Sequence, residues 1–469
     1  MVAAVTAALV VGPAVVVAPV PAFTGFLLLG AAIFTWTRPA TAVVACIVTA
    51  SLHRGLFLYL RVETGNYPLS VFDVLPPLLL LASVSLASRG RHPAPPTRAP
   101  LAVCTAMIFA GLVMGVIIGA SEAAAYEMVR VLRLEGWILC VLVCAIVAGH
   151  LPQWRKAVAT GLLGAGLCVA AQLLVSFGWS LATGTYFWSL FPFGRSVGNL
   201  AGNIQSGNVL TLRENAVSGF LILPALSLLI LRFSGRDFAM LMFLVAGGLA
   251  WLSRGLWVAM CLMLIIALAH RVASGRLSGA KLTRIVIPVV AAVCTLLLAS
   301  GDILGQRIGE TTNLRGDVSF DVRRLETEAA LEALAEGPGS MVFGLGSGVV
   351  VDFPRTSAFG KRSALLENSV LGLWTNTGLL GLLGVTLLFF GAALRGWRLA
   401  SDRDHPDRAV LGSMSLALPV LWLQGFIGGT FTVPEPAILL FLLAGTALAT
   451  PLATEYRCRT GASEPSSTK

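Results

Sequence analysis

The chain has 469 residues, of which 56% are hydrophobic and 12% are charged, and its formal net charge is +10. This apolar content exceeds what a soluble core of that size needs, so the composition excludes a soluble protein and predicts an integral membrane protein. The Lys and Arg residues lie between apolar runs rather than on one polar face. We therefore expect contact with membrane lipid and no binding to nucleic acid.

The apolar runs predict an all-α fold, in the form of a polytopic transmembrane helical bundle. Each clear run is about 20 residues long, which suffices to cross roughly 30 Å of hydrocarbon, and the runs predict about 12–14 spans. We assign residues 1–450 to one transmembrane domain with two long segments, 178–214 and 301–366, and residues 451–469 to a disordered cytoplasmic tail. In chain order the expected spans are 2–18, 21–37, 40–60, 68–87, 101–120, 128–149, 157–177, 215–232, 238–252, 255–270, 284–300, 367–393, 409–427 and 435–450.

Basic residues between the spans predict the topology. Alternate short connections carry Lys or Arg, as the positive-inside rule requires of cytoplasmic loops. Both termini are then cytoplasmic, in a bacterial plasma (inner) membrane, and the two long segments lie outside with the active site. In the second long segment an amphipathic stripe from Val322 to Leu334 predicts a helix, which Gly337 and Pro338 end.

Arginine residues at membrane depth or on the outer side are the most informative charges. Arg254 stands alone between two apolar runs and is flanked by Trp251 and Trp257. An ionisable side chain at this depth indicates a functional site, and an anchor at the end of a span is the alternative. Because a guanidinium is a planar fork that matches phosphate oxygens, a group of arginines at the outer mouth of a bundle predicts a diphosphate ligand.

Three other features each allow two interpretations. Arg130 and Arg133 either contribute to a site or pair with glutamates along their own helix. Gly344 and Gly346 belong to a glycine run that either lets backbone amides approach an anion or is a flexible loop. His53 is either a buried proton carrier or a core residue, and we favour the core residue.

Short motifs from about Arg213 onward carry a family resemblance. They are Arg213-Glu-Asn215, Leu252-Ser-Arg-Gly-Leu-Trp257, Arg324-Leu325, Phe343-Gly-Leu-Gly-Ser-Gly348, Glu367-Asn368-Ser-Val-Leu371 and Thr377-Gly-Leu-Leu-Gly381. Their order, spacing and topology resemble the O-antigen ligase and O-antigen polymerase superfamily. The resemblance implies a helical-bundle glycosyltransferase of the GT-C type, which moves a glycan from a polyprenyl-diphosphate carrier to an acceptor outside the membrane.

The resemblance also implies roles for single residues. Arg254 and Arg324 match the arginines of the family that contact the diphosphate. The family usually has His before the Asn of the fifth motif, whereas this chain has Glu367. We expect Glu367 to be the catalytic base, followed by Asp352 and His53, because a buried carboxylate can accept a proton from an acceptor hydroxyl; the alternative is that Glu367 caps a helix or pairs with a nearby cation. The expected substrate-binding residues are Arg213, Arg323, Asn215, Ser253, Asn368, Gly344 and Gly346.

The outer segments contain no Asp-x-Asp pair, so we expect no metal site and no cofactor. The expected function is metal-independent transfer of a glycan from a polyprenyl-diphosphate donor to a glycan, lipid or cell-wall acceptor, by a polymerase or a ligase. The alternative is a transporter that flips a lipid-linked sugar. A transporter would place its charges near the midplane and within reach of both sides, whereas the polar groups here concentrate at one face.

Overall fold

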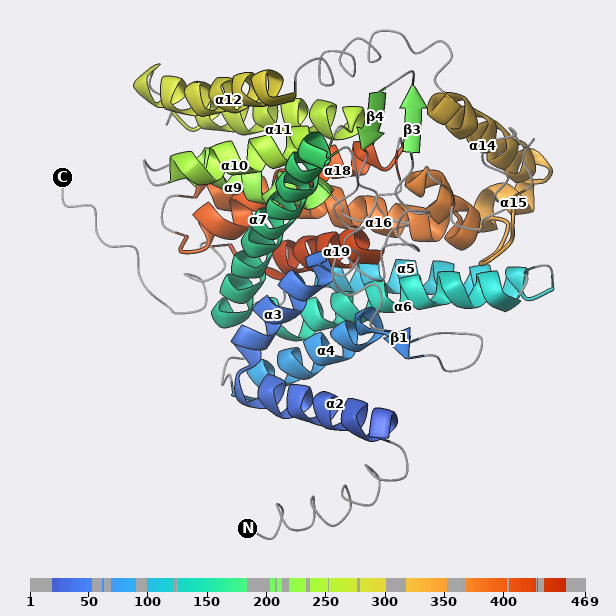
Figure 1. Cartoon of the computed structure of the whole chain (residues 1–469). Helices are drawn as coiled ribbons and strands as arrows, with labels where there is room; N and C mark the ends of the chain where they lie inside the picture. Colours follow the sequence, from blue (N-terminus) through green and yellow to red (C-terminus); the bar gives the residue numbers. More distant parts are fainter. Residues whose placement is uncertain are drawn as a thin grey trace.

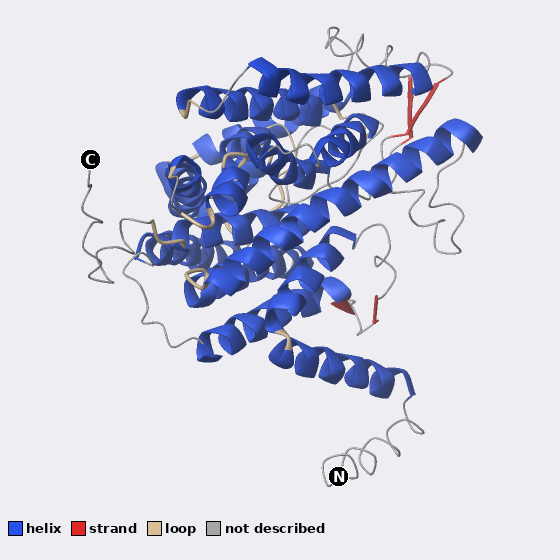
Figure 2. Cartoon of the chain, turned by 90° about the vertical axis from the view of Figure 1, so that its left-hand side faces the viewer, coloured by secondary structure: helices blue, strands red, loops and turns tan. Residues whose placement is uncertain are grey.

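The computed structural model confirms the all-α fold over the residues that it describes (Figure 2). The only strands among them form two short antiparallel hairpins, β1 (Arg61–Val62) with β2 (Leu69–Ser70), and β3 (Asn203–Ser206) with β4 (Val209–Leu212). The structure describes residues 19–52, 61–62, 69–89, 99–121, 123, 125–183, 203–206, 209–212, 219–232, 237–251, 253–275, 279–300, 318–351, 366, 368–402, 405–426, 428 and 434–452.

Five helices in the described part of the chain are long and apolar enough to cross a membrane, which identifies a membrane protein. They are α5 (Ala99–Gly119), α6 (Ala125–Ala148), α7 (Pro152–Thr183), α11 (Arg254–Ala273) and α16 (Ser369–Ser401). The rest of the bundle consists of α2 (Pro19–Thr37), α3 (Pro39–Leu52), α4 (Val71–Arg89), the 3-10 turn η4 (Gly219–Leu221) with α9 (Ile222–Arg232), α10 (Asp237–Ala250), α12 (Gly279–Ser300), the π-helical turn η5 (Arg408–Gly412) with α17 (Ser413–Ser415) and α18 (Leu418–Gln424), and α19 (Pro434–Ala449). Every predicted span from 21–37 onward overlaps one of these helices, while span 2–18 and tail residues 453–469 lie outside the described residues.

Successive helices alternate in direction, so their connections collect at two ends of the bundle (Figure 1). We call one end the basic end; it holds residues 148–152, 273–275, 401–402, 405–408 and 449–452. We call the other the loop end; it holds residues 119–121, 251, 253–254, 336–351, 424–426 and 428. The described residues that flank the predicted cytoplasmic connections thus lie at the basic end, and those that flank the two predicted long segments lie at the loop end.

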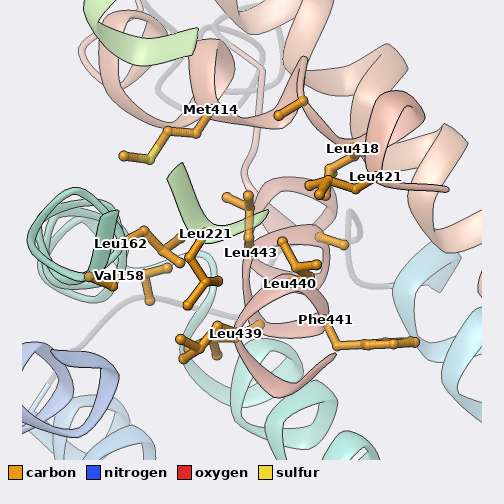
Figure 3. Packing of buried hydrophobic residues seen from close by; sticks show 14 of the residues in the cluster. Val158, Leu162, Leu221, Met414, Leu418, Leu421, Leu439, Leu440, Phe441 and Leu443 are labelled. Carbon is orange, nitrogen blue, oxygen red and sulfur yellow. The ribbon is translucent and has the colours of Figure 1, made fainter. Parts of the chain in front are cut away.

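Helix α19 forms the centre of the bundle (Figure 3). All residues from 436 to 450 are buried, as expected of a helix that is apolar on every side. Leu440 and Phe441 of α19 belong to the same buried cluster as Leu162 of α7 and Leu418 of α18. The core therefore unites helices that lie far apart in the chain, from Val43 of α3 to Ala449 of α19.

Small residues bring α5 and α16 into backbone contact. A Cβ at Gly111 would lie 2.7 Å from the backbone nitrogen of Gly381, and one at Gly115 would lie 2.0 Å from the carbonyl oxygen of Asn376. In a membrane the hydrophobic effect does not drive helices together, so their association depends on this kind of close backbone packing at small residues. The helical geometry of α16 is interrupted at Gly378, which has φ 66° and ψ −174°.

The helix predicted inside the second long segment is present as α14 (Val318–Ala335). Gly337 then caps a second short helix, α15 (Pro338–Phe343), with Pro338 at its start. Both helices lie at the loop end beside α16 (Figure 1). Leu334 of α14 is buried together with Leu366 and Leu371, so α14 is packed on the beginning of α16 rather than tethered by a free linker.

Candidate functional site

Two long helices begin next to the end of α18 at the loop end, and each has a polar cap. Ser253 precedes α11, and its hydroxyl accepts a hydrogen bond from the Leu256 amide at 3.5 Å. Asn368 precedes α16, and its side-chain oxygen accepts one from the Leu371 amide at 3.0 Å. Both caps are buried. Polar N-caps satisfy amides that a helix start otherwise leaves free, so these residues fix where each helix begins.

The end of α18 joins these two helix starts. The Val370 amide donates to the carbonyl oxygen of Gly425 at 3.3 Å, and the Ser369 hydroxyl donates to that of Gly428 at 2.8 Å. Gln424 lies against α11, since a Cβ at Gly255 would be 2.7 Å from its Nε2. We call this group the loop-end cluster; it consists of Ser253, Arg254, Gly255, Asn368, Ser369, Val370, Gln424, Gly425 and Gly428.

The start of α9 reaches the same place. The rings of Phe220 and Trp251 meet edge to face with centroids 5.0 Å apart. Gly219 packs against the Trp251 ring so closely that a Cβ there would lie 2.3 Å from it. The chain that follows the predicted residues Arg213 and Asn215 therefore arrives next to the loop-end cluster.

Two features at the loop end favour an anion, namely the starts of two helices and an exposed arginine. The first turns of α11 and α16 each present the positive end of a helix dipole, which attracts negative groups. On α14, Arg323 is half-buried, whereas Arg324 is 58% exposed with its Nε 3.8 Å from the Glu328 carboxylate. An exposed pair at this spacing contributes only about 0.3–0.5 kcal/mol, so Arg324 can leave Glu328 for a stronger partner at little cost.

The structure thus describes part of the predicted site. Ser253 and Asn368 share the loop-end cluster, and α14, which carries both arginines, packs on α16. Arg254 opens α11, but its side chain lies outside the described residues. Also outside them are Arg213, Asn215, Glu367, Asp352 and His53.

The glycine run is neither open to an anion nor free of the bundle. Gly344, Gly346 and Gly348 all have positive φ and lie against helix backbones. The Gly344 amide donates to Ser340 and the Gly346 amide donates to Thr375, both to carbonyl oxygens. Because these amides are engaged within the protein, the run acts as a strap that holds α15 to α5 and α16.

The charges at the start of α6 do not all pair as expected. Arg130 lies 3.6 Å from Glu127 along the helix. Arg133 instead forms an ion pair with Asp73 of α4, and its guanidinium lies 5.0 Å from the Trp137 ring centroid. Glu135 is left buried inside α6, with one carboxylate oxygen that has no hydrogen-bond partner. The sequence analysis did not include Asp73; its position as a lone acidic residue at the start of an apolar run is the signal that could have indicated a partner in another span.

A buried polar cluster at the basic end was not anticipated. Arg155 and Asp407 form an ion pair with side chains 1% and 6% exposed. The Asp407 amide donates to Nδ1 of His405, whose Nε2 lies 2.9 Å from the Pro451 carbonyl oxygen. Burial lowers the pKa of His405, although the neighbouring Asp407 acts in the opposite direction. This cluster joins the start of α7, the turn before η5 and the end of α19.

Among the described side chains, no three His, Cys, Asp or Glu residues are close enough together to hold a metal ion.

Comparison with known proteins finds no protein-family model and no curated protein that matches the chain.

Proposed function

We propose that the chain transfers a glycan from a polyprenyl-diphosphate carrier to an acceptor hydroxyl at the outer face of a bacterial plasma membrane, as a polysaccharide polymerase or ligase. The observation that carries the proposal is the loop-end cluster, in which the first turns of α11 and α16 lie against the end of α18. Two helix starts, of which that of α16 packs on arginine-bearing α14, suit a lipid diphosphate. The loop end is then the outer end, and the basic end faces the cytoplasm.

In this proposal the arginines hold the donor. Arg254 at the start of α11 and Arg324 on α14 contact the diphosphate, with Arg213 and Arg323 beside them. The weak pair between Arg324 and Glu328 supports this role, because a dianionic ligand competes easily for that guanidinium. Arginine charge also stabilises the diphosphate as it leaves, which is the step where negative charge develops. No metal ion is needed for that purpose.

The reaction is a substitution at the anomeric carbon. The acceptor oxygen forms a bond to that carbon as the bond from the carbon to the diphosphate oxygen breaks. Polyprenyl diphosphate leaves, and the hydroxyl proton passes to the base, which we assign to Glu367. Its neighbour Asn368 starts α16 with a buried cap, and this fixed helix start supports a positioned base.

The test is a transfer assay with purified protein, polyprenyl-diphosphate glycan and candidate acceptors. Arg254→Ala is expected to lower the initial rate by about 10²–10³-fold, and Arg324→Ala by at least about tenfold, because each removes charge from the leaving group. The matched control is Arg398→Ala, at the opposite end of α16, with unchanged rate expected. All variants should elute as folded protein. Full activity of Arg254→Ala would overturn the proposed mechanism.

A transporter for a lipid-linked sugar is the second candidate, and Glu135 is the observation that favours it. A buried carboxyl inside a span is a feature that transporters use to couple or guide a substrate. The two functions separate in sealed vesicles that carry donor in one leaflet. A transporter moves the intact donor to the other leaflet without acceptor, whereas a transferase consumes it only when acceptor is present.

A further inference from the structure

Helix α15 exposes apolar side chains outside the bundle core. Met341, Val342 and Phe343 are 47%, 47% and 46% exposed, and the helix buries none of its side chains. Three consecutive large apolar residues on one short element make a local patch that water disfavours. Such a patch indicates an apolar partner.

The backbone of α15 is fixed, so these side chains cannot turn inward. The indole Nε1 of Trp374 donates to the Met341 carbonyl oxygen at 2.8 Å. At the break in α16, a Cβ on Gly378 would lie 2.6 Å from the carbonyl carbon of Phe343. Helix α15 therefore packs on α16 by its main chain and leaves its side chains outward.

The strap sets the height of α15 along the bundle. Ser347, just after α15, donates its amide to Gly115, and a Cβ at Gly119 would lie 2.5 Å from the Ser347 carbonyl oxygen. Gly119 ends α5, whose 21 residues span about 31 Å at 1.5 Å per residue. That length matches a hydrocarbon core of roughly 30 Å. Helix α15 is thus level with one boundary of the membrane.

The exposed patch also continues the apolar surface of the neighbouring spans. On α5, Phe109, Val113 and Ile117 are exposed at four-residue spacing and form one stripe. On α16, Leu380 and Leu383 are exposed just beyond the Gly378 break. Helix α15 packs against both helices. The partner of α15 should therefore have the same apolar chemistry as whatever covers the exposed stripes of α5 and α16.

We propose that α15 is an interfacial anchor, which inserts Met341, Val342 and Phe343 among the acyl chains of the adjacent bilayer leaflet. Because α14 and α15 are joined by only Glu336 and Gly337, the anchor holds α14 at the membrane surface. Trp374 at the same level fits the preference of Trp for the membrane boundary. This inference does not depend on the proposed glycan transfer.

The test places a photoreactive benzoylphenylalanine in the full chain, reconstituted in phosphatidylethanolamine and phosphatidylglycerol vesicles with tritiated acyl chains. The reporter replaces Phe343, with Met341 as a second position in the same turn. Leu387, exposed in the middle of α16, is the lipid-facing reference, and Glu332, exposed on α14, is the matched control. After irradiation, the label bound to protein is counted at each position.

Lipid labelling at Phe343 is expected to lie within about twofold of Leu387 and at least about fivefold above Glu332. Labelling at Phe343 and Met341 no higher than at Glu332 would overturn the proposal. A crosslinked species of twice the chain mass would also overturn it, because the occupant of the patch would then be a second copy of the chain.

Discussion

Replacing Asp407 with Asn should destabilise the basic end strongly, because it leaves Arg155 charged and buried. Arg155 Nη2 lies 2.6 Å from the Asp407 carboxylate, and Nε donates to the same oxygen at 2.7 Å. Breaking a buried pair from one side costs about 3–5 kcal/mol, and we expect about 3 kcal/mol because Asn keeps one acceptor. That loss shifts the unfolding equilibrium by roughly 100-fold. It can be measured by unfolding the purified protein in mixed micelles with increasing SDS, followed by tryptophan fluorescence.

The control for Asp407→Asn is Glu328→Gln, which breaks the exposed pair with Arg324 and should cost about 0.5 kcal/mol or less. A double variant, Arg155→Met with Asp407→Leu, should recover most of the lost stability, because it leaves no buried charge. If Asp407→Asn is no less stable than Glu328→Gln, the buried pair does not support the basic end as described.

Three further predictions concern single residues. The pKa of His405 lies below 6.5 in the folded protein, so the unfolded state binds a proton more readily. The contribution of His405 to the free energy of unfolding should therefore be fully present above about pH 6.5 and be lost as pH drops through the folded-state pKa. A His405→Gln variant whose stability has the same pH slope would contradict this. Gly378→Ala should release α15 and speed proteolysis between α14 and α16, because the new Cβ would meet the Phe343 backbone at a positive φ. Gly339 has open space around it, so Gly339→Ala should be cleaved at the same rate as the parent protein. Asn368→Ala should cost about 1 kcal/mol of stability, because the N-cap of α16 is lost. Asn368→Ser should keep that stability, because Ser is also an N-cap residue, and still lose transfer activity. An active Ser variant would show that Asn368 only caps the helix.

Much of the fold could be predicted because hydrophobic run length determines whether a helix spans a membrane. The run expected at 128–149 is α6, Ala125–Ala148, and the run expected at 435–450 is α19, Pro434–Ala449. The stripe from Val322 to Leu334 likewise predicted α14. These signals are local, since each depends on residues within one helix.

What could not be predicted depends on contacts between distant segments. Asp407 and Arg155 are separated by 252 positions and each resembles an ordinary loop charge. The break at Gly378 lies in a run of small and apolar residues, and only the approach of the Phe343 backbone explains it. The same holds for the glycine run, in which the Gly346 amide donates to α16 and the Ser347 amide donates to α5.

The candidate site was predictable in its position rather than in its chemistry. Ser253 and Asn368 each begin a span on the side of the long segments, and the structure has both in one cluster. The roles of Arg254 and Glu367 remain predictions, because they depend on the geometry of side chains around a ligand. Spacing along a sequence carries no information on that geometry.

The most direct measurement is the fate of the donor when the purified chain is the only protein present. Vesicles containing the chain are incubated with polyprenyl-diphosphate glycan and acceptor in EDTA, and the products are separated by mass. We predict that glycosylated acceptor and polyprenyl diphosphate form in equal amounts. We also predict that the rate in EDTA equals the rate with added Mg²⁺. Donor that stays intact with every glycan, lipid and cell-wall acceptor would contradict the assignment as a glycosyltransferase.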